Sequence, residues 1–548
     1  RLSVAPLPRT GEGLGEGALL RYAVGIMRVL NVVGPRTLRR ELEAKVSRHP
    51  NKAWLIYESA DGSTTQLTYG GFLRRAYQAA HVLTDLGVRP GDKVTLHLTN
   101  CLEFLELWFG AAICGAVIVP VNTLSSLDEL EYLVNHSESA LIFTEPALLE
   151  TVEKLIPRCP GVRNVLVCRA NEDAGPALAY NRLRDAAPDT PPDHQPRPED
   201  EVAILYTSGT TSKPKGCLIT NANYVYVGES VARELRASPD DRWLTVLPFF
   251  HGNSQYYCTM PALVVGATVV VTERFSASRY FAQATRYDCT LSSLFAAPMR
   301  MLLAQQPAPA DQQHRLRLVI FAQNVTEQQL AEWDERFGAP LLQIYGMTEQ
   351  LGHPLANPLD YPRDNMTVGW PSLGWQVRLV DEDGQDVPDG EVGQIVVRGE
   401  PGVSLMKGYF KNPEATAEAI RDGWLWTGDN ARVNERGYVC FVDRAKDMIK
   451  RSGENVAASE VEAVLKDHPA VFDAAVIGIP DPIRDEAIKA FVILREGASA
   501  SPEELVGWCA ERLARFRVPE RIEFRTEFPR TSVGKIQKHL LRAEAAPA

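Results

Sequence analysis

The sequence lacks any run of about 18 to 20 apolar residues, the length that a membrane-spanning helix needs. The most apolar stretch near the start, residues 18–34, is interrupted by Arg21 and Arg28. A secretory signal would have an uninterrupted apolar centre. We therefore expect a cytoplasmic protein without a membrane span, in which residues 1–36 form an N-terminal extension with a Gly- and Pro-rich start.

Cysteine is sparse and shows no metal-binding or disulfide pattern. The 548 residues include nine cysteines, and none of them forms a C-x-x-C pair. This spacing excludes the common zinc motifs, and a disulfide framework is not expected in a chain of this size. We expect the cysteines to be small buried side chains in a reducing compartment.

An excess of positive charge is also missing. The chain has 58 Lys and Arg residues against 69 Asp and Glu residues, a net charge of −11. This balance gives no reason to expect nucleic acid as a partner. No internal repeat of 20 to 50 residues is visible. The length predicts one large domain and at least one smaller one.

Helical and strand-like patterns alternate from residue 38 onward, which predicts layers of α/β structure. The clearest helices are Leu38–Arg48 and Gly70–Leu86, and the clearest strands are Lys93–Leu98 and Val117–Pro120. The apolar run Val264–Thr272 reads as a single buried strand. The expected fold is a large multi-layer α/β domain.

The pattern changes in the last hundred or so residues, which read as compact α+β structure. Ala458–Asp467 is predicted as an amphipathic helix that begins with a capping box between Ser459 and Glu462. We predict a large domain over residues 37–443 and a small mobile domain over residues 444–548.

One hydroxyl-rich segment has the composition of a phosphate-binding loop. Tyr206–Gly216 reads YTSGTTSKPKG, after the strand Val202–Tyr206 and before a helix that begins near Thr220. Its hydroxyls and N–H groups can surround phosphate oxygens, and its two lysines can neutralise them. It is not a Walker loop, because Pro214 stands where that motif needs Gly. Composition alone fits a Ser/Thr-rich surface turn equally well.

The full string resembles the signature of the acyl-adenylate-forming superfamily, which includes acyl-CoA synthetases, firefly luciferase and the adenylation domains of nonribosomal peptide synthetases. The resemblance extends from about Leu38 to Leu541, with the motifs in the family's order. It implies an ATP-dependent carboxylic acid–CoA ligase that uses ATP, Mg²⁺ and coenzyme A. Such an enzyme forms an acyl-AMP, releases pyrophosphate, and then transfers the acyl group to the CoA thiol.

Further motifs resemble the family's nucleotide site. Tyr345–Glu349 (YGMTE) matches the motif in which Tyr lies near adenine, Thr contacts the α-phosphate and Glu holds Mg²⁺. Trp424–Asp429 matches the ribose motif, and Arg444 matches an Arg that also holds ribose. The resemblance assigns ATP or AMP binding to Thr207, Ser208, Gly209, Thr210, Thr211, Lys215, Gln343, Tyr345, Thr348, Asp429, Arg444 and Lys535.

The C-terminal motifs imply a moving small domain. Lys446 aligns with the family's hinge, about which this domain rotates between the two half-reactions. Lys535, within PRTSVGKIQK, aligns with the late catalytic lysine that binds the carboxylate and the α-phosphate during adenylation. The implied catalytic residues are Lys535, Thr348, Glu349 and His251, and the implied CoA-binding residues are Lys450, Ser452, Gly453 and Glu454.

The acyl pocket is less well defined. Leu247–His251 (LPFFH) resembles the motif whose last residue gates the pocket, so His251 is the expected gate. Residues 252–257 contain no acidic residue, which argues against an amino acid substrate. Residues 321–324 (FAQN) depart from the Gly/Ala-rich segment of many members, so the adenine contacts there stay open. The predicted acyl pocket residues are His251, Gly252, Tyr256, Ala322, Gln323 and Gly346.

These segments are most similar to the crotonobetaine/carnitine–CoA ligase branch, although a bulky hydrophobic, aryl or polycyclic acid fits the sequence as well. Three alternatives stay open: transfer of the acyl group to a separate carrier protein, a non-catalytic nucleotide- or acyl-binding protein, and a luciferase-like oxygenase. A homodimer is also left open.

Overall fold

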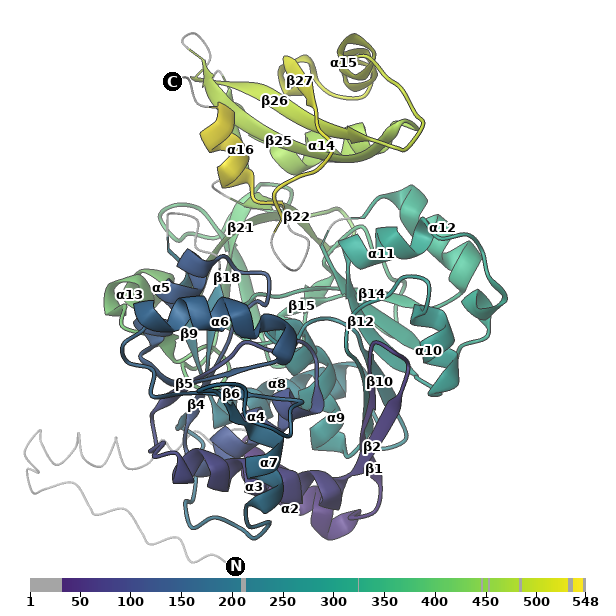
Figure 1. Cartoon of the computed structure of the whole chain (residues 1–548). Helices are drawn as coiled ribbons and strands as arrows, with labels where there is room; N and C mark the ends of the chain where they lie inside the picture. The colour runs from purple at the N-terminus through teal and green to yellow at the C-terminus, as the bar shows by residue number, and fades with distance from the viewer. Residues whose placement is uncertain are drawn as a thin grey trace, which may run out of the picture.

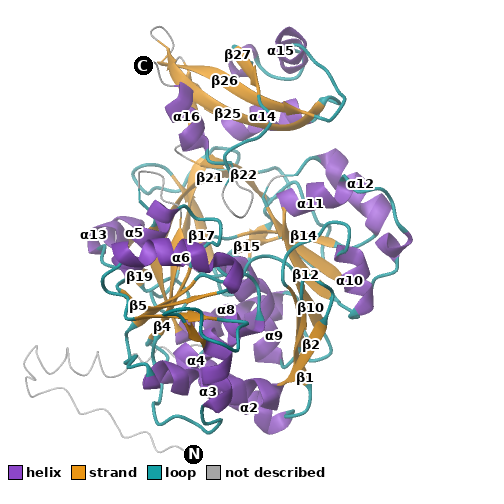
Figure 2. Cartoon of the chain, in the orientation of Figure 1, coloured by secondary structure: helices purple, strands orange, loops and turns teal. Residues whose placement is uncertain are grey.

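The computed structural model contains three sheets in the N-terminal part of the chain and a fourth sheet in the C-terminal part (Figure 1). The structure describes residues 32–207, 213–323, 325–444, 447–451, 454–481, 485–530 and 536–545. Within these ranges no helix is both long enough and apolar enough to cross a membrane. The mixture of helices and strands in both parts (Figure 2) confirms the predicted α/β class with a second α+β unit.

The first sheet has nine strands, in the order β16-β15-β14-β13-β12-β10-β11-β1-β2. Its six central strands, from β14 to β1 in that order, are parallel. The strands are β1 (Ala53–Glu58), β2 (Thr64–Thr68), β10 (Arg242–Thr245), β11 (Thr268–Thr272), β12 (Leu291–Phe295), β13 (Leu318–Ala322), β14 (Leu341–Tyr345), β15 (Leu355–Ala356) and β16 (Trp370–Pro371).

The second sheet has eight strands, in the order β19-β9-β8-β4-β3-β5-β6-β7. Strands β3 to β8 are parallel, while β9 and β19 are antiparallel to their neighbours. The strands are β3 (Lys93–Leu96), β4 (Val117–Pro120), β5 (Ser139–Thr144), β6 (Asn164–Val167), β7 (Leu178–Ala179), β8 (Glu201–Thr207), β9 (Lys215–Thr220) and β19 (Gly408–Tyr409).

The chain leaves the third sheet at Arg444 and enters the fourth at Met448. The third contains β17 (Gln376–Val380), β18 (Gly393–Arg398), β20 (Ile420–Arg421), β21 (Trp424–Val433) and β22 (Val439–Arg444). The fourth contains β23 (Met448–Arg451), β24 (Glu454–Ala457), β25 (Val471–Asp481), β26 (Asp485–Leu494) and β27 (Arg521–Phe524). Sheet membership therefore changes between β22 and β23.

Helices pack around the sheets. Those in the large part are α2 (Leu38–Arg48), α3 (Tyr69–Asp85), α4 (Leu102–Cys114), α5 (Leu127–Ser137), α6 (Leu149–Leu155), α7 (Tyr180–Ala186), α8 (Asn221–Glu234), α9 (Met260–Val265), α10 (Tyr280–Arg286), α11 (Ala296–Leu303), α12 (Glu327–Phe337) and α13 (Pro413–Ala419). Those in the small part are α14 (Ala458–Lys466), α15 (Pro502–Ala510) and α16 (Lys538–Ala545). Figure 1 shows the small part above the large one, with α16 facing β21 and β22.

One buried cluster joins the two large sheets. It contains Trp54 of β1, Val94 of β3 and Trp108 of α4, so both sheets and the helices beside them share a core. The packed structure begins before residue 37, because Val33 is buried against α8 and Arg36 forms an ion pair of 2.6 Å with Glu229. The predicted extension thus ends in contact with the large domain, and its first 31 residues lie outside the described ranges.

Two local predictions were wrong. The run predicted as one strand over Val264–Thr272 is divided: α9 ends at Val265, Gly266 closes it with φ of 79°, and β11 begins at Thr268. The left-handed conformation at Gly266 ends the helix. The predicted capping box is also absent, because Ser459 Oγ donates to the carbonyl of Val442 and Ala457 occupies the N-cap position.

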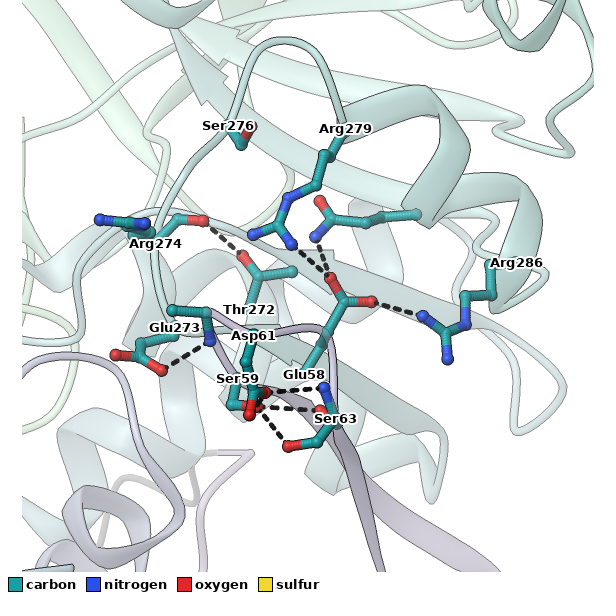
Figure 3. A network of polar contacts seen from close by, with 12 residues as sticks. Glu58, Ser59, Asp61, Ser63, Thr272, Glu273, Arg274, Ser276, Arg279 and Arg286 are labelled. Atoms are coloured by element: carbon teal, nitrogen blue, oxygen red, sulfur yellow. Dashed lines mark hydrogen bonds and ion pairs between the residues drawn. The ribbon is translucent and has the colours of Figure 1, made fainter.

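A polar network far from the motifs joins the first sheet to α10. Glu58, at the end of β1, is only 3% exposed and accepts hydrogen bonds from Gln283 (2.5 Å) and Tyr287 (2.6 Å). Figure 3 shows Arg279 and Arg286 approaching the same carboxylate, at 3.6 and 3.3 Å. A buried carboxylate needs such partners, so this network fixes α10 against the strand.

Candidate active site

The carboxyl ends of the parallel strands of the first sheet bring several predicted residues to one edge. Tyr345 is the last residue of β14, Gln323 follows β13, Phe295 ends β12, and His251 lies in the loop after β10. In open α/β sheets ligands bind outside these carboxyl ends. The topology therefore gathers the second nucleotide motif and the predicted acyl pocket along one edge.

The second sheet contains the two strands that flank the predicted phosphate loop. Strand β8 ends at Thr207, and β9 begins at Lys215, its partner across the hairpin. The Thr207 hydroxyl lies 3.3 Å from Oε1 of Glu349, so the loop begins beside the predicted magnesium residue. The predicted residues Ser208, Gly209, Thr210 and Thr211 lie outside the described ranges.

Glu349 connects three separate segments of the chain. It is 5% exposed, and the hydroxyl of Tyr409 donates to its Oε1 at 3.0 Å. The Nζ atom of Lys215 lies 5.1 Å from the centre of the Tyr409 ring. Burial and the Glu349 carboxylate raise the pKa of Tyr409, which therefore stays a protonated donor. A carboxylate, a hydroxyl and a lysine thus meet where the triphosphate is expected.

A direct hydrogen bond joins the two motifs that are predicted to bind adenine and ribose. The hydroxyl of Tyr345 donates to Oδ2 of Asp429 at 2.7 Å, and both residues are buried. Asp429 on β21 stands opposite Arg444 on β22 in the antiparallel register. Burial and the Asp429 carboxylate raise the pKa of Tyr345, which keeps this hydrogen bond in place at neutral pH. Three residues from distant motifs therefore lie together.

A short π-helix contains Tyr256, one of the predicted acyl pocket residues. It covers Ser254–Thr259, and such helices are frequent at functional sites. A side chain at Gly252 would collide with the ring of Tyr256, and one at Gly346 would collide with the hydroxyl of Tyr257. The ring of Tyr256 therefore requires glycine at position 252, and the carbonyl oxygen of Gly352 together with the hydroxyl of Tyr257 requires it at position 346.

Gln323 and His251 occupy distinct positions in the same region. Gln323 has φ of 85°, a left-handed conformation that side chains rarely adopt, and its carbonyl lies 3.4 Å from Nε2 of Gln343. The ring of His251 packs edge-on against Phe295, with centroids 5.3 Å apart. The FAQN segment therefore departs from ordinary backbone geometry where the sequence departs from the family pattern.

Two residues of this region were missed from the sequence. Tyr409 lies in a Gly-Tyr pair with no distinctive chemistry, and only folding brings it to Glu349. His353, four positions after Glu349, is 2% exposed, and neither ring nitrogen has a hydrogen-bond partner among the described residues. Burial lowers the pKa of His353 to about 4, so the ring is neutral at pH 7. Extending the YGMTE motif by a few residues would have included it.

The structure describes only some of the residues that were predicted to function in the C-terminal part. Lys450 and Glu454 belong to the hairpin of β23 and β24, where Arg451 pairs with Glu454. Ser452 and Gly453, the hinge residue Lys446 and the catalytic candidate Lys535 lie outside the described ranges.

Known proteins match this chain over nearly its whole length. Residues 42–410 match the model of the AMP-binding enzyme family, and residues 460–535 match that of the AMP-binding enzyme C-terminal domain. A crotonobetaine/carnitine–CoA ligase of Proteus mirabilis is 38% identical, over 93% of this chain and 100% of that protein.

Solved structures agree with this match. An anthranilate CoA ligase in complex with anthranoyl-AMP is 28% identical with a TM-score of 0.85, covering 93% of this chain and 98% of that one. A benzoate CoA ligase from Burkholderia xenovorans LB400 is 27% identical with a TM-score of 0.82, covering 92% and 100%. The chain belongs to the AMP-binding enzyme family and is an ATP-dependent carboxylic acid–CoA ligase that acts through an acyl-adenylate.

Proposed function

We propose that the acid which this ligase activates is a betaine of the crotonobetaine or carnitine type. The observation that supports this proposal most is the identity of 36–38% to crotonobetaine/carnitine–CoA ligases that are covered over their full length. The solved structures named for anthranilate and benzoate are only 27–28% identical. One fold therefore serves several acids, and the more similar relatives favour the betaine.

The surroundings of the predicted pocket suit a quaternary ammonium. Such a group has no hydrogen to donate, so aromatic faces are its natural partners. Tyr256 and Tyr257 lie beside Gly252 and Gly346, and the ring of His353 lies 6.2 Å from that of Tyr257. All three rings are neutral at pH 7, because burial raises the pKa of both tyrosines and lowers that of His353.

Two acids of equal shape but different charge, with a third acid for comparison, test the proposal. Crotonobetaine is compared with 5,5-dimethylhex-2-enoate, in which carbon replaces the charged nitrogen, and with benzoate. Pyrophosphate release is measured with each acid, ATP and MgCl₂. We expect kcat/KM to be at least about tenfold higher for the charged acid, as a desolvated cation–π contact allows. Equal or higher values with the neutral isostere or with benzoate would overturn the proposal.

We infer the following roles at the nucleotide. Asp429 and Arg444 hold the ribose, Tyr345 lies at the adenine, and Thr348 contacts the α-phosphate. An oxygen of the substrate carboxylate attacks the α-phosphorus, and the bond to pyrophosphate breaks. The CoA sulfur then attacks the carbonyl carbon, the bond to AMP breaks, and the thiol proton passes to solvent. Lys535 neutralises charge in the first step, so the chemistry consists of positioning and charge neutralisation.

The residues around Glu349 fit a magnesium ion. Mg²⁺ takes carboxylate and other oxygen ligands and usually bridges phosphates with only one or two ligands from the protein. Glu349, with the Thr207 hydroxyl 3.3 Å away, supplies oxygens of this kind. The ion, when bound, would neutralise charge on the phosphates.

The domain boundary and the hinge remain part of the proposal. We place the boundary at residues 443/444 and the hinge at Lys446, which the change of sheet between β22 and β23 supports. Lys450, Ser452, Gly453 and Glu454 are proposed to contact the pantetheine arm. The reaction is assigned to the cytoplasm, where ATP and CoA are supplied. A homodimer is a further prediction, which light scattering of the purified protein tests.

A further inference from the structure

A chain of ion pairs runs through the small domain along α14. Nζ of Lys538, at the start of α16, lies 2.8 Å from Oε1 of Glu462 on α14. Glu462 lies 3.9 Å from Lys466 one helical turn later. Lys466 lies 3.2 Å from Asp473 of β25, and Asp473 forms an ion pair with Arg530. Five charges of alternating sign thus follow one another in space.

The two ends of this ion-pair chain flank the segment that contains Lys535. Arg530 precedes residues 531–535 and Lys538 follows them. The ends also lie against each other, because Arg530 pairs with Ile536 in an isolated bridge and the N–H of Gln537 donates to the carbonyl of Pro529 at 2.8 Å. Both flanks of the segment are therefore attached to α14 and β25.

The charges are shielded from solvent, which makes them depend on one another. The side chains of Asp473, Glu462 and Lys538 are 2, 12 and 14% exposed. Burial alone would raise the pKa of Asp473, but Lys466, Arg300 and Arg530 lower it to about 2. Burial would lower the pKa of Lys538, yet Glu462 and nearby Asp443 and Asp447 raise it. Asp473 and Lys538 therefore keep their charges at neutral pH, and removing one charge of the chain leaves a partner uncompensated.

The ion-pair chain also interacts electrostatically with the large part of the protein and with residues on either side of the proposed hinge. Arg300, one of the cations that act on Asp473, belongs to α11 of the large part. Asp443 and Asp447 stand on either side of residues 445–446, and Asp447 pairs with Arg542 of α16 at 2.6 Å. The charges at Asp473 and Lys538 are therefore sensitive to how the large and small parts are arranged.

We propose that Glu462, Lys466 and Asp473 are positioning residues for adenylation, because they fix Arg530 and Lys538, the described residues on either side of the segment that contains Lys535. None of the three touches the reacting atoms. This inference rests on the role proposed above for Lys535. The ion-pair chain serves only the first half-reaction, since Lys535 has no part in attack by the CoA thiol.

The variants Glu462→Gln and Asp473→Asn remove one charge each with little change of shape. In Glu462→Gln the new amide oxygen keeps an acceptor for the N–H of Val476, which Glu462 binds at 2.8 Å. The matched control is Glu460→Gln, on the same helix, which removes a different ion pair, to Arg517. Each protein is assayed for pyrophosphate release with ATP and acid, and separately for thioester formation from supplied acyl-adenylate and CoA.

We expect both test variants to lose about 10- to 100-fold in kcat for pyrophosphate release, the cost of a misplaced catalytic group. Thioester formation should stay within about twofold of wild type, and Glu460→Gln should change neither rate. Deuterium exchange of the peptide that contains residues 531–537 should rise in the test variants alone. The inference is overturned if Glu462→Gln behaves as Glu460→Gln does, or if both half-reactions fall together.

Two further proteins separate failure of this inference from failure of the proposed function. Wild type that never releases pyrophosphate with any acid would overturn the proposed function. Lys535→Ala that keeps adenylation would overturn the role of Lys535. If wild type is active and Lys535→Ala loses adenylation alone, the rates of Glu462→Gln and Asp473→Asn test the positioning role of the ion-pair chain. Deuterium exchange of the 531–537 peptide tests the same role without depending on catalysis.

Discussion

Glu349 lies at the predicted phosphate end of the site, where it contacts Thr207 and Tyr409 from two other segments. Glu349→Gln keeps the size of the side chain and removes its charge. We expect kcat for pyrophosphate release to fall by about 100-fold or more, since a preorganised charge at the reacting phosphates is lost. The MgCl₂ concentration for half-maximal rate should rise.

Tyr409→Phe is a milder change at the same place, and its rate is compared with that of Glu349→Gln. It keeps the ring beside Lys215 and removes only the hydroxyl that donates to Glu349. A smaller loss, about tenfold, is expected, because a hydrogen bond to a charged group is lost while the charge stays. A Glu349→Gln enzyme with wild-type dependence on MgCl₂ would contradict the magnesium assignment.

His353 predicts how stability varies with pH. Its pKa is about 4 in the folded protein, because burial disfavours the charged ring, whereas an unfolded histidine titrates near 6.5. The contribution of the neutral buried ring to the free energy of unfolding is complete above about pH 6.5. It is lost as the pH falls from 6.5 toward 4, because the unfolded histidine takes up a proton that the folded one does not. The difference between the two pKa values corresponds to at most about 3.4 kcal/mol. Urea unfolding at pH 7.5 and pH 5 measures it.

The control for the histidine is His353→Gln, which cannot take up a proton. Its unfolding midpoint should change less between the two pH values than that of wild type. Equal changes in the two proteins would show that His353 does not carry this pH dependence.

At the scale of the elements, we expect changes in the network around Glu58 to alter the free energy of unfolding and not the chemistry. Glu58→Ala removes the acceptor that Gln283 and Tyr287 share in the interior. We expect the free energy of unfolding to fall by about 2 to 4 kcal/mol, which urea titration measures. Arg286→Ala, whose side chain is 56% exposed, should cost less than about 1 kcal/mol. Similar losses in the two variants would contradict this account.

Regular elements with a clear pattern could be predicted from the sequence closely. The bounds of α2 and β4 agree with Leu38–Arg48 and Val117–Pro120, because amphipathic spacing and a short β-branched run are local signals. The run at Val264–Thr272 could not be divided correctly, since an apolar run fits a helix end as well as a buried strand. Only the turn at Gly266 distinguishes the two.

The capping box at Ser459 and Glu462 failed for a tertiary reason. The spacing fits the motif, but Ser459 binds the carbonyl of Val442 and Glu462 pairs with Lys538. Val442 belongs to β22 and Lys538 to α16, so both partners lie outside α14. A local rule cannot anticipate such competition for a side chain.

At the scale of the whole molecule, motif strings selected predicted nucleotide residues that the fold brings together. Tyr345 and Asp429 come from separate motifs and share a hydrogen bond. Tyr409 and His353 were missed because their positions depend on contacts between distant segments, which no short string encodes.

The proposed domain rotation predicts two variants with opposite defects. Lys446→Pro restricts the backbone at the hinge and at the residue before it. We expect it to keep pyrophosphate release within about threefold and to lose about 100-fold in thioester formation, because the second arrangement of the domains is not reached. Lys535→Ala should show the reverse. Single-turnover assays of each half-reaction measure both.

An unchanged thioester rate in Lys446→Pro would place the pivot elsewhere. The conservative variant Lys446→Ala serves as the control, since it removes the side chain without restricting the backbone. It should retain both half-reactions, which would assign the hinge to the main chain.

The distribution of the cysteines gives the enzyme a natural attachment point for a fluorescent reporter. Eight of the nine are buried, whereas Cys440, near the start of β22, is partly exposed. Burial raises the pKa of Cys440, so a maleimide dye should react faster at pH 8.5 than at pH 7. We expect mass spectrometry of the native protein to show one adduct, and two would contradict this. A change in emission from that dye when ATP, acid and CoA are added would then report the proposed turning of the small domain in the unmutated enzyme.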